Sequence, residues 1–230
     1  MATILIAANI IVFLIIAGAG FFGFTLSDKL GLPASFSSAI RQPWTIITYS
    51  VSQANLLQLL FNMLWLFGFG KLFLMRATDR MLLIVYASGG VAGGLFYLAA
   101  GSLFNISSNG LLLGSSAAVI AVATAVAAMM PNLEITLPLF GPTKIKWVVG
   151  VVILIFFIGL STPNAGGNLA HIGGVAAGIA AARIIAFRGK TVSSPSTEYE
   201  ALAGKIKKSG FESLSAKERR RFFELSNKNR

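Results

Sequence analysis

Long stretches of the sequence contain no charged residue, and they constrain the fold more than any other feature. Among them are residues 43–70, 81–133 and 147–182. Charged residues make up 12 % of the chain and hydrophobic residues 55 %, whereas about a quarter of the residues in a soluble domain are charged. A soluble fold needs polar cover over its exposed faces, so these stretches indicate segments that cross a membrane.

Six segments are apolar and long enough to cross a bilayer as a helix, which takes about 20 residues. They cover residues 4–24, 55–74, 81–101, 113–130, 145–162 and 168–187. The first has no basic leader and no A-x-A cleavage site, so we expect a transmembrane helix rather than a removable signal. The sequence predicts an all-α polytopic membrane protein, with a six-helix domain at 1–187 and a short cytoplasmic helical tail at 188–230.

Basic residues predict the orientation of these spans. Lys71, Arg76 and Arg80 lie at the end of the second span and between it and the third, and Lys144 and Lys146 lie where the connection from the fourth span meets the fifth. The tail is also basic, whereas the loops after the third and fifth spans contain no Lys or Arg. Two basic residues in the first loop oppose this pattern but are outnumbered. The positive-inside rule therefore places both termini in the cytoplasm.

The tail carries most of the net charge of +11. The other basic residues of the chain lie at span ends and in loops, which fits contact with membrane lipid and argues against nucleic acid as a partner. Two capping-box patterns, Thr197-x-x-Glu200 and Ser215-x-x-Glu218, predict short helices at about 198–208 and 216–227. Such a tail fits either a regulatory docking element or a solvated segment touching anionic lipid, and the sequence slightly favours the second.

Three polar residues fall at nearly the same depth on alternate spans. Gln58, Ser116 and His171 each lie three or four residues inside the outer end of the second, fourth and sixth spans. His171 is the only histidine, and an ionisable group within a span usually has a function or a specific partner. A serine hydroxyl becomes nucleophilic beside a base, for which imidazole is the usual choice. Taken singly, both residues also fit ordinary helix packing.

Acyl transfer also needs hydrogen-bond donors for the developing oxyanion. Gln58 and Asn62 are spaced i, i+4 and therefore share one helix face. Backbone N–H groups at the start of the fourth span, that of Ser116 among them, are further candidates because the first turn of a helix leaves them free. The alternative interpretation of the two amides is polar contact between helices.

Small residues accompany both candidate catalytic groups. Gly174 and Gly178 follow His171 at positions +3 and +7, and Gly114 opens the alanine-rich fourth span. Such smooth faces permit two helices to approach closely within a membrane. We expect these glycines to pack the helices that carry the site.

The order and spacing of these motifs, over roughly residues 1–187, resemble the rhomboid family of intramembrane serine proteases. The matching segments are 43–49 and 59–63, the paired glycines at 89–90 and 93–94, the G-x-S-x motif at 114–117, and the A-H-x-x-G-x-x-x-G motif at 170–178. The resemblance implies that Ser116 is the nucleophile and His171 the general base of a dyad. It also implies that Asn62 and the backbone N–H of Ser116 hold the oxyanion, and that transmembrane proteins are the substrates. The resemblance is to the bacterial type of the family, so we expect a bacterial inner membrane protein.

The sequence departs from the family pattern at four positions. Gln53 and Gln58 stand where rhomboids usually have histidines, Thr45 replaces the arginine of a Trp-Arg pair, and Ala117 replaces a glycine. These changes keep the dyad. Because an amide can still donate a hydrogen bond, we expect them to affect the rate of the reaction rather than its mechanism.

Two other classes of function compete with a protease. A rhomboid-like pseudoprotease would bind membrane proteins without cleaving them, but such proteins typically lose the serine or the histidine. A transporter would need charged residues at mid-membrane depth or an inverted repeat, and the sequence has neither. We expect no cofactor and no metal, because the chain has one histidine, no cysteine and few carboxylates outside the tail.

Overall fold

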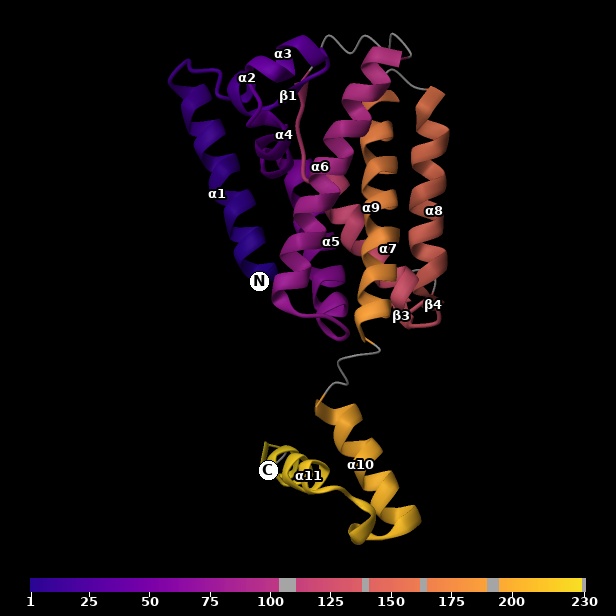
Figure 1. The fold of residues 1–230 in the computed structure, drawn as a ribbon. Coiled ribbons are helices and arrows are strands. Elements are labelled where there is room, and N and C mark those ends of the chain that lie inside the picture. The colour runs from indigo at the N-terminus through magenta and orange to yellow at the C-terminus, as the bar shows by residue number, and fades with distance from the viewer. Residues whose placement is uncertain (104–110, 138–140, 162–164, 190–194, 229–230) are drawn as a thin grey trace. The chain divides into compact units, whose positions relative to one another are not determined.

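The chain forms two compact units in a computed structural model that describes residues 1–103, 111–137, 141–161, 165–189 and 195–228. The first unit is Met1–Arg183 and the second is Ile184–Arg230. The first is a helical bundle, and the second is built from two helices that follow the last helix of the bundle (Figure 1).

Six helices of the described chain run side by side in the bundle (Figure 1). They are α1 (Ala2–Phe21), α5 (Leu56–Leu74), α6 (Asp79–Leu103), α7 (Ser116–Met129), α8 (Ile145–Ile158) and α9 (Ala165–Gly189). Among the described residues, α1, α5, α6 and α9 contain segments long and apolar enough to cross a membrane, whereas α7 and α8 are shorter. The predicted all-α polytopic bundle is confirmed, and the count of six spans stays a prediction.

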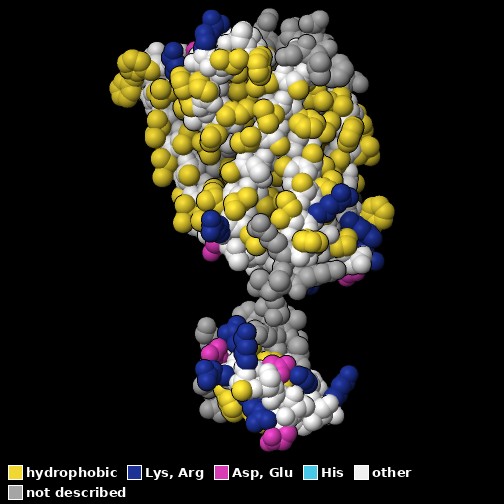
Figure 2. All heavy atoms as spheres, in the orientation of Figure 1, with side chains coloured by type: hydrophobic (Ala, Val, Ile, Leu, Met, Phe, Trp, Pro, Cys, Tyr) yellow, Lys and Arg dark blue, Asp and Glu magenta, His cyan; other side chains and the backbone are white. Residues whose placement is uncertain are grey.

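The outer face of the bundle is apolar. Figure 2 shows hydrophobic side chains over most of the face in view, with Lys and Arg toward its ends. Large apolar side chains on α1, α5, α6 and α8 are exposed; examples are Ile4, Leu57, Ile84 and Leu154. A soluble protein rarely exposes apolar patches of such extent. Lipid is the medium that suits this surface, so the chain is an integral membrane protein.

The loop between α1 and α5 is folded into short elements. They are α2 (Ser27–Leu30), β1 (Leu32–Pro33), α3 (Phe36–Arg41), α4 (Thr45–Thr48) and the 3₁₀ turn η1 (Tyr49–Val51). Trp44 Nε1 donates to the Lys29 carbonyl over 2.8 Å, and the Tyr49 hydroxyl donates to the Gly90 carbonyl over 2.6 Å. The first bond closes the loop on itself, and the second fastens it to α6.

Two short antiparallel strand pairs lie at the edges of the bundle. β1 pairs with β2 (Leu111–Leu112), and β3 (Glu134–Leu137) pairs with β4 (Gly141–Lys144). The first pair joins the first loop to the segment that leads into α7. The second forms the turn between α7 and α8.

Helix α7 is the central helix of the bundle, and residues 117–126 on it are all buried. It packs against α6 and α9 through glycines that leave no room for a side chain. A Cβ on Gly93 of α6 would lie 2.5 Å from the Ala117 Cβ, and a Cβ on Gly174 or Gly178 of α9 would meet the carbonyls of Ala117 and Ala121. The small residues thus let three helix backbones come into direct contact.

Helix α7 begins at Ser116, later than the expected start of the fourth span at residue 113. Two features hold the preceding segment in a non-helical conformation. Gly114 has a positive φ of 134°, which glycine adopts far more readily than other residues. Its N–H donates to the Tyr49 carbonyl over 3.0 Å. The nucleophile candidate therefore occupies the first turn of its helix.

The second unit holds α10 (Pro195–Ser209) and α11 (Ala216–Lys228) with the 3₁₀ turn η3 (Phe211–Ser213) between them. Leu202, Leu214 and Leu225 form its buried cluster.

One of the two predicted capping boxes is confirmed. The Ser215 N–H donates to Glu218 Oε2 over 2.8 Å, and the Glu218 N–H donates to Ser215 Oγ over 3.3 Å. The side chains of the other box, at Thr197 and Glu200, lie outside the described residues. Lys205 of α10 pairs with Glu218 over 2.9 Å, so the confirmed box also links the two helices.

We predict that Gly178→Leu destabilises the bundle by about 1–3 kcal/mol, the range typical of overpacked cores. A Cβ at Gly178 would lie 2.9 Å from the Thr124 Cβ as well as against the Ala121 carbonyl, so α9 would have to move away from α7. Equilibrium unfolding in detergent measures the change. The matched control is Gly150→Leu on α8, where no atom lies within 4 Å of the added Cβ. Equal stability of the two variants would contradict this account of the packing.

We also predict that the second unit loses stability in acid through Glu218. Its hydrogen bond with Lys205, followed by those with Ser215, lowers the pKa of this carboxyl from 4.5 to about 2. A lowered pKa in the folded state stabilises above the unfolded value, so the contribution is lost as the pH falls from about 4.5 toward 2. A ¹³C NMR titration of labelled glutamate in the full chain measures the midpoint. Lys205→Met should raise it, and an unchanged midpoint in that variant would refute the assignment.

Candidate functional site

The structure brings Ser116 and His171 into hydrogen-bond contact. Ser116 Oγ lies 2.7 Å from His171 Nε2, although the two residues are 55 positions apart in the chain. Ser116 begins α7, and His171 lies six residues after the start of α9. The tight packing of α7 against the glycines of α9 sets this separation. The distance is within the range in which imidazole accepts the proton of a serine hydroxyl.

The length of α7 accounts for the common depth of the two side chains. The helix has 14 residues. At the rise of an α-helix this length corresponds to roughly 21 Å, whereas the hydrocarbon core of a bilayer is about 30 Å thick. A helix of this length that ends near one surface begins about 9 Å below the other. His171 lies about 9 Å along α9 from Ala165, since it follows six residues later. By these lengths the pair lies about 9 Å below the membrane surface at the Ser116 end of α7 and about 6 Å from the membrane centre.

His171 has an apolar environment on one side and the serine on the other. The ring of Phe156, from α8, has its centroid 4.0 Å from that of His171. The buried Nδ1 of His171 has no hydrogen-bond partner among the residues that the structure describes. A neutral imidazole whose Nε2 accepts from serine carries its proton on Nδ1. In the described part of the chain, no carboxylate contacts Nδ1, the ring nitrogen remote from Ser116.

A cavity of about 200 Å³ opens beside the pair. It lies among α5, α7, α8 and α9, and its lining residues are Phe61, Asn62, Trp65, Ser116, Val119, Ile120, Val152, Phe156 and His171. The lining is largely apolar, with three polar side chains. Asn62, Ser116 and His171 thus lie around one space. The role of Asn62 as an oxyanion donor stays a prediction.

Gln58 makes different contacts from those expected of an oxyanion donor. Its Oε1 accepts from the Ala54 N–H over 2.8 Å, and its Nε2 donates to the Leu113 carbonyl over 3.0 Å. It is not among the residues that line the cavity. The side chain packs against Gly114, where an added Cβ would meet Gln58 Nε2. Gln58 therefore fastens the segment before Ser116 to the start of α5, and its role as a donor stays a prediction.

Gln53 is the residue near this site that the sequence singles out only as a departure from the family pattern. Its side chain is 2 % exposed and contacts both Asn62 and Ser115, the neighbour of Ser116. A fully buried glutamine needs hydrogen-bond partners. Its position directly before the second span could have marked it as a residue near the site. The sequence alone does not show which residues it contacts.

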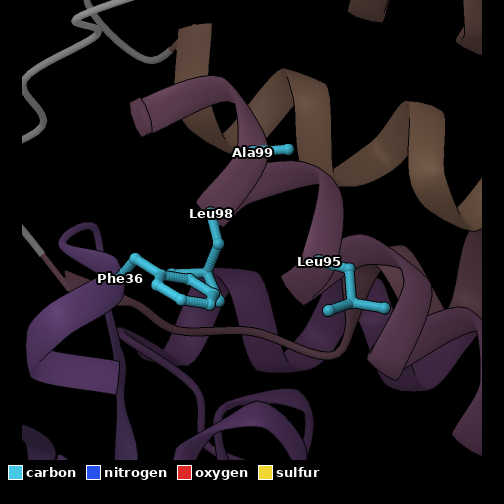
Figure 3. A pocket seen from close by; sticks show the side chains of 4 residues that line it. All are labelled: Phe36, Leu95, Leu98 and Ala99. Atoms are coloured by element: carbon cyan, nitrogen blue, oxygen red, sulfur yellow. The ribbon is translucent and has the colours of Figure 1, made fainter. Parts of the chain in front are cut away.

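A second cavity, of about 470 Å³, lies between α3 and α6. Figure 3 shows its four lining side chains, Phe36, Leu95, Leu98 and Ala99. The lining offers no hydrogen-bonding or titratable side chain, so this cavity has no means of catalysis. In the described part of the chain, no group of three His, Cys, Asp or Glu residues is placed to hold a metal ion.

Comparison with known protein families adds to this geometry. The Rhomboid domain matches residues 40–188, which include α4 to α9 and both members of the Ser116–His171 pair. A comparison with curated proteins found no match. The matched region covers more than half of the chain, and it holds α5 to α8, nearly all of α9, the glycine contacts and the cavity beside Ser116. The chain therefore belongs to the rhomboid family.

Proposed function

We propose that this protein is an intramembrane serine protease that cleaves transmembrane segments of other membrane proteins with a Ser116–His171 dyad. The observation that carries the proposal is the 2.7 Å contact between Ser116 Oγ and His171 Nε2 beside a cavity. Membership of the rhomboid family supports it, because members typically are intramembrane serine proteases acting on membrane-protein substrates.

The chemistry follows from the positions of the two side chains. His171 Nε2 takes the proton of Ser116 as Oγ attacks the substrate carbonyl carbon and forms a C–O bond. The tetrahedral intermediate collapses, the peptide C–N bond breaks, and the imidazolium gives its proton to the leaving amine. A water molecule then gives a proton to His171 Nε2 as its oxygen attacks the acyl carbon. The bond between that carbon and Ser116 Oγ breaks, the imidazolium returns its proton to Oγ, and the product leaves as a carboxylic acid.

Donors for the oxyanion lie around the same cavity. The N–H of Ser116 belongs to the first turn of α7, a position that leaves it without a partner inside the helix. The helix dipole adds positive potential at this end. The Asn62 amide lines the cavity from α5. We assign the oxyanion to the Ser116 N–H and the Asn62 side chain, with Gln58 as a further candidate.

Substrate would reach the dyad from the side of the bundle. The cavity is bounded by Trp65 of α5 and by Val152 and Phe156 of α8. Outer-face residues of these helices, such as Leu64 and Ile155, are exposed toward lipid. A transmembrane segment that unwinds near α8 could place an extended peptide against Ser116. Water would enter from the outer face, since the pair lies closer to that surface.

We further propose that the protein lies in a bacterial inner membrane with both termini in the cytoplasm, as the distribution of basic residues indicates. The six helices would form the membrane domain at 1–187, and the tail at 188–230 would face the cytoplasm. The ammonium group of Met1 contacts the Asp79 carboxylate at the start of α6 over 2.8 Å. This contact supports a common side for the N-terminus and the basic loop after α5.

A rhomboid-like pseudoprotease is the alternative function. Its support is the pair of glutamines at positions 53 and 58, where rhomboids usually have histidines. Against it, Ser116 and His171 are both kept and are in contact. The two functions differ in one measurable property, which is covalent chemistry at Ser116.

We predict that Ser116→Ala and His171→Ala each abolish cleavage of a transmembrane substrate and labelling by a fluorophosphonate. Loss of either member of such a unit removes nucleophilic catalysis, typically by more than about 10³-fold. Purified protein in detergent with a generic rhomboid substrate provides the assay. The matched control is Ser88→Ala, which removes a hydroxyl of α6 that donates to the Val85 carbonyl of its own helix.

A folded wild-type protein that neither cleaves nor labels would favour the pseudoprotease. The variant Gln58→His then separates two causes of this inactivity. Activity gained in Gln58→His would show that the glutamine limits the rate, and continued inactivity would leave binding without cleavage as the function.

We predict that Asn62→Ala lowers kcat by about 10²–10³-fold with little change in KM, the size expected for a lost oxyanion donor. Steady-state kinetics in detergent measures both constants. A fall confined to KM would instead assign Asn62 to substrate binding, and an unchanged kcat would remove it from the oxyanion site.

A further inference from the structure

A chain of buried amides runs from α1 to the catalytic cavity. Asn62 Nδ2 donates to Gln53 Oε1 over 2.9 Å, and Gln53 Nε2 donates to Asn9 Oδ1 over 2.8 Å and to Ser115 Oγ over 2.9 Å. Asn9 and Ser115 are 0 % exposed, Gln53 2 % and Asn62 8 %. Gln53 is bonded to each of the other three. It therefore joins α1, α5 and the segment before Ser116.

The direction of these hydrogen bonds is fixed at the end remote from the cavity. Asn9 Nδ2 donates to the Leu5 carbonyl over 2.8 Å and to the Tyr86 hydroxyl over 3.0 Å. A backbone carbonyl only accepts, so the NH₂ of Asn9 must face Leu5 and its oxygen must face Gln53. The NH₂ of Gln53 then faces Asn9, and its oxygen faces Asn62. Each amide sets the orientation of the next.

The last of these hydrogen bonds, between Asn62 and Gln53, determines which end of the Asn62 amide is available at the cavity. One N–H of the Asn62 amide donates to Gln53 Oε1. The second N–H of the same NH₂ group is left to donate to another acceptor. A reversed Asn62 would set its oxygen against Gln53 Oε1, and two buried carbonyl oxygens in contact are costly. An oxyanion donor must be oriented before the reaction to be effective.

We propose that Gln53 is a positioning residue that holds the Asn62 amide in the orientation of an oxyanion donor. The inference rests on the proposed function, since it concerns the rate of the Ser116 reaction. Glutamine suits the position because one side chain supplies one acceptor and two donors, and all three are used here. An imidazole ring has two nitrogens and could make at most two of these bonds.

The competing interpretation is that Gln53 only holds α1 and α5 together. Both interpretations expect a loss of stability when Gln53 is replaced, so stability alone does not separate them. They differ in the coupling to Asn62. A positioning residue has no effect on kcat once the group that it positions is gone, whereas a general structural contact keeps its effect.

The test is a double-mutant cycle with Gln53→Met and Asn62→Ala, in the full chain in detergent, at a temperature where every variant is folded. We expect Gln53→Met to lower kcat by about 10-fold or more with KM unchanged, because a misoriented donor stabilises the oxyanion less. We expect the double variant to have the kcat of Asn62→Ala alone. The rate of fluorophosphonate labelling at Ser116 is measured in parallel and should follow the same pattern, independently of substrate choice.

The matched control is Gln42→Met, the same replacement in the same loop. The side-chain oxygen of Gln42 is buried without a hydrogen-bond partner in the described part of the chain, so its loss should leave kcat and labelling unchanged. If Gln53→Met does not fold, Asn9→Leu takes its place in the cycle. This replacement removes the side chain that orients Gln53. When it is added to Asn62→Ala, it should likewise cause no further change in kcat.

The outcomes separate the two proposals. Cleavage by the wild type that is lost in Ser116→Ala upholds the protease, and the cycle then tests Gln53 alone. An unchanged kcat in Gln53→Met, or effects of the two replacements that multiply, would overturn the positioning role and leave the protease intact. Absence of both cleavage and labelling in the wild type would overturn both.

Discussion

The direct backbone contact of α7 with α6 and α9 is the constraint on which the site depends. Side chains on Gly93 or Gly174 would push the helices apart, because a Cβ added at either position would lie closer to an atom of α7 than ordinary contact allows. Within lipid there is little hydrophobic drive to bring helices together, so close packing must hold them. The 2.7 Å separation of Ser116 and His171 is a result of that packing.

Polar groups form a second level of organisation around α7. In a membrane interior an unpaired amide is costly, so those present must be bonded to one another or to backbone. Here they bond the first loop and α1 to the ends of α5 and α7: Gln58 reaches the Leu113 carbonyl, and Gln53 reaches Ser115 and Asn62. The two glutamines that depart from the family pattern thus both act on the segment around Ser116.

Much of this can be predicted from the sequence, for reasons that can be named. Uncharged stretches indicate the helices, and small residues near His171 indicate close packing. Hydropathy starts the fourth span at residue 113, because it does not detect the positive φ of Gly114 or the bond from its N–H to Tyr49. Hydropathy also does not identify the hydrogen-bond partners of Gln53, since Asn9, Asn62 and Ser115 come from separate parts of the chain. Periodicity places residues on helix faces, but only the packed bundle decides which faces meet.

The order of the helices along the chain has a consequence for biosynthesis. The proposed nucleophile lies on α7, but the only histidine, which is its proposed base, lies on α9, the last helix of the bundle in the described part of the chain. A ribosome-bound chain that has inserted everything through α8 holds a serine without its base. Helix α7 packs against glycines of two helices, α6 and α9, and the second of these contacts forms only once α9 is present. Under the proposed mechanism, a nascent chain is therefore inert toward other proteins being inserted beside it, and competence to cleave arises only when synthesis of the membrane domain is complete.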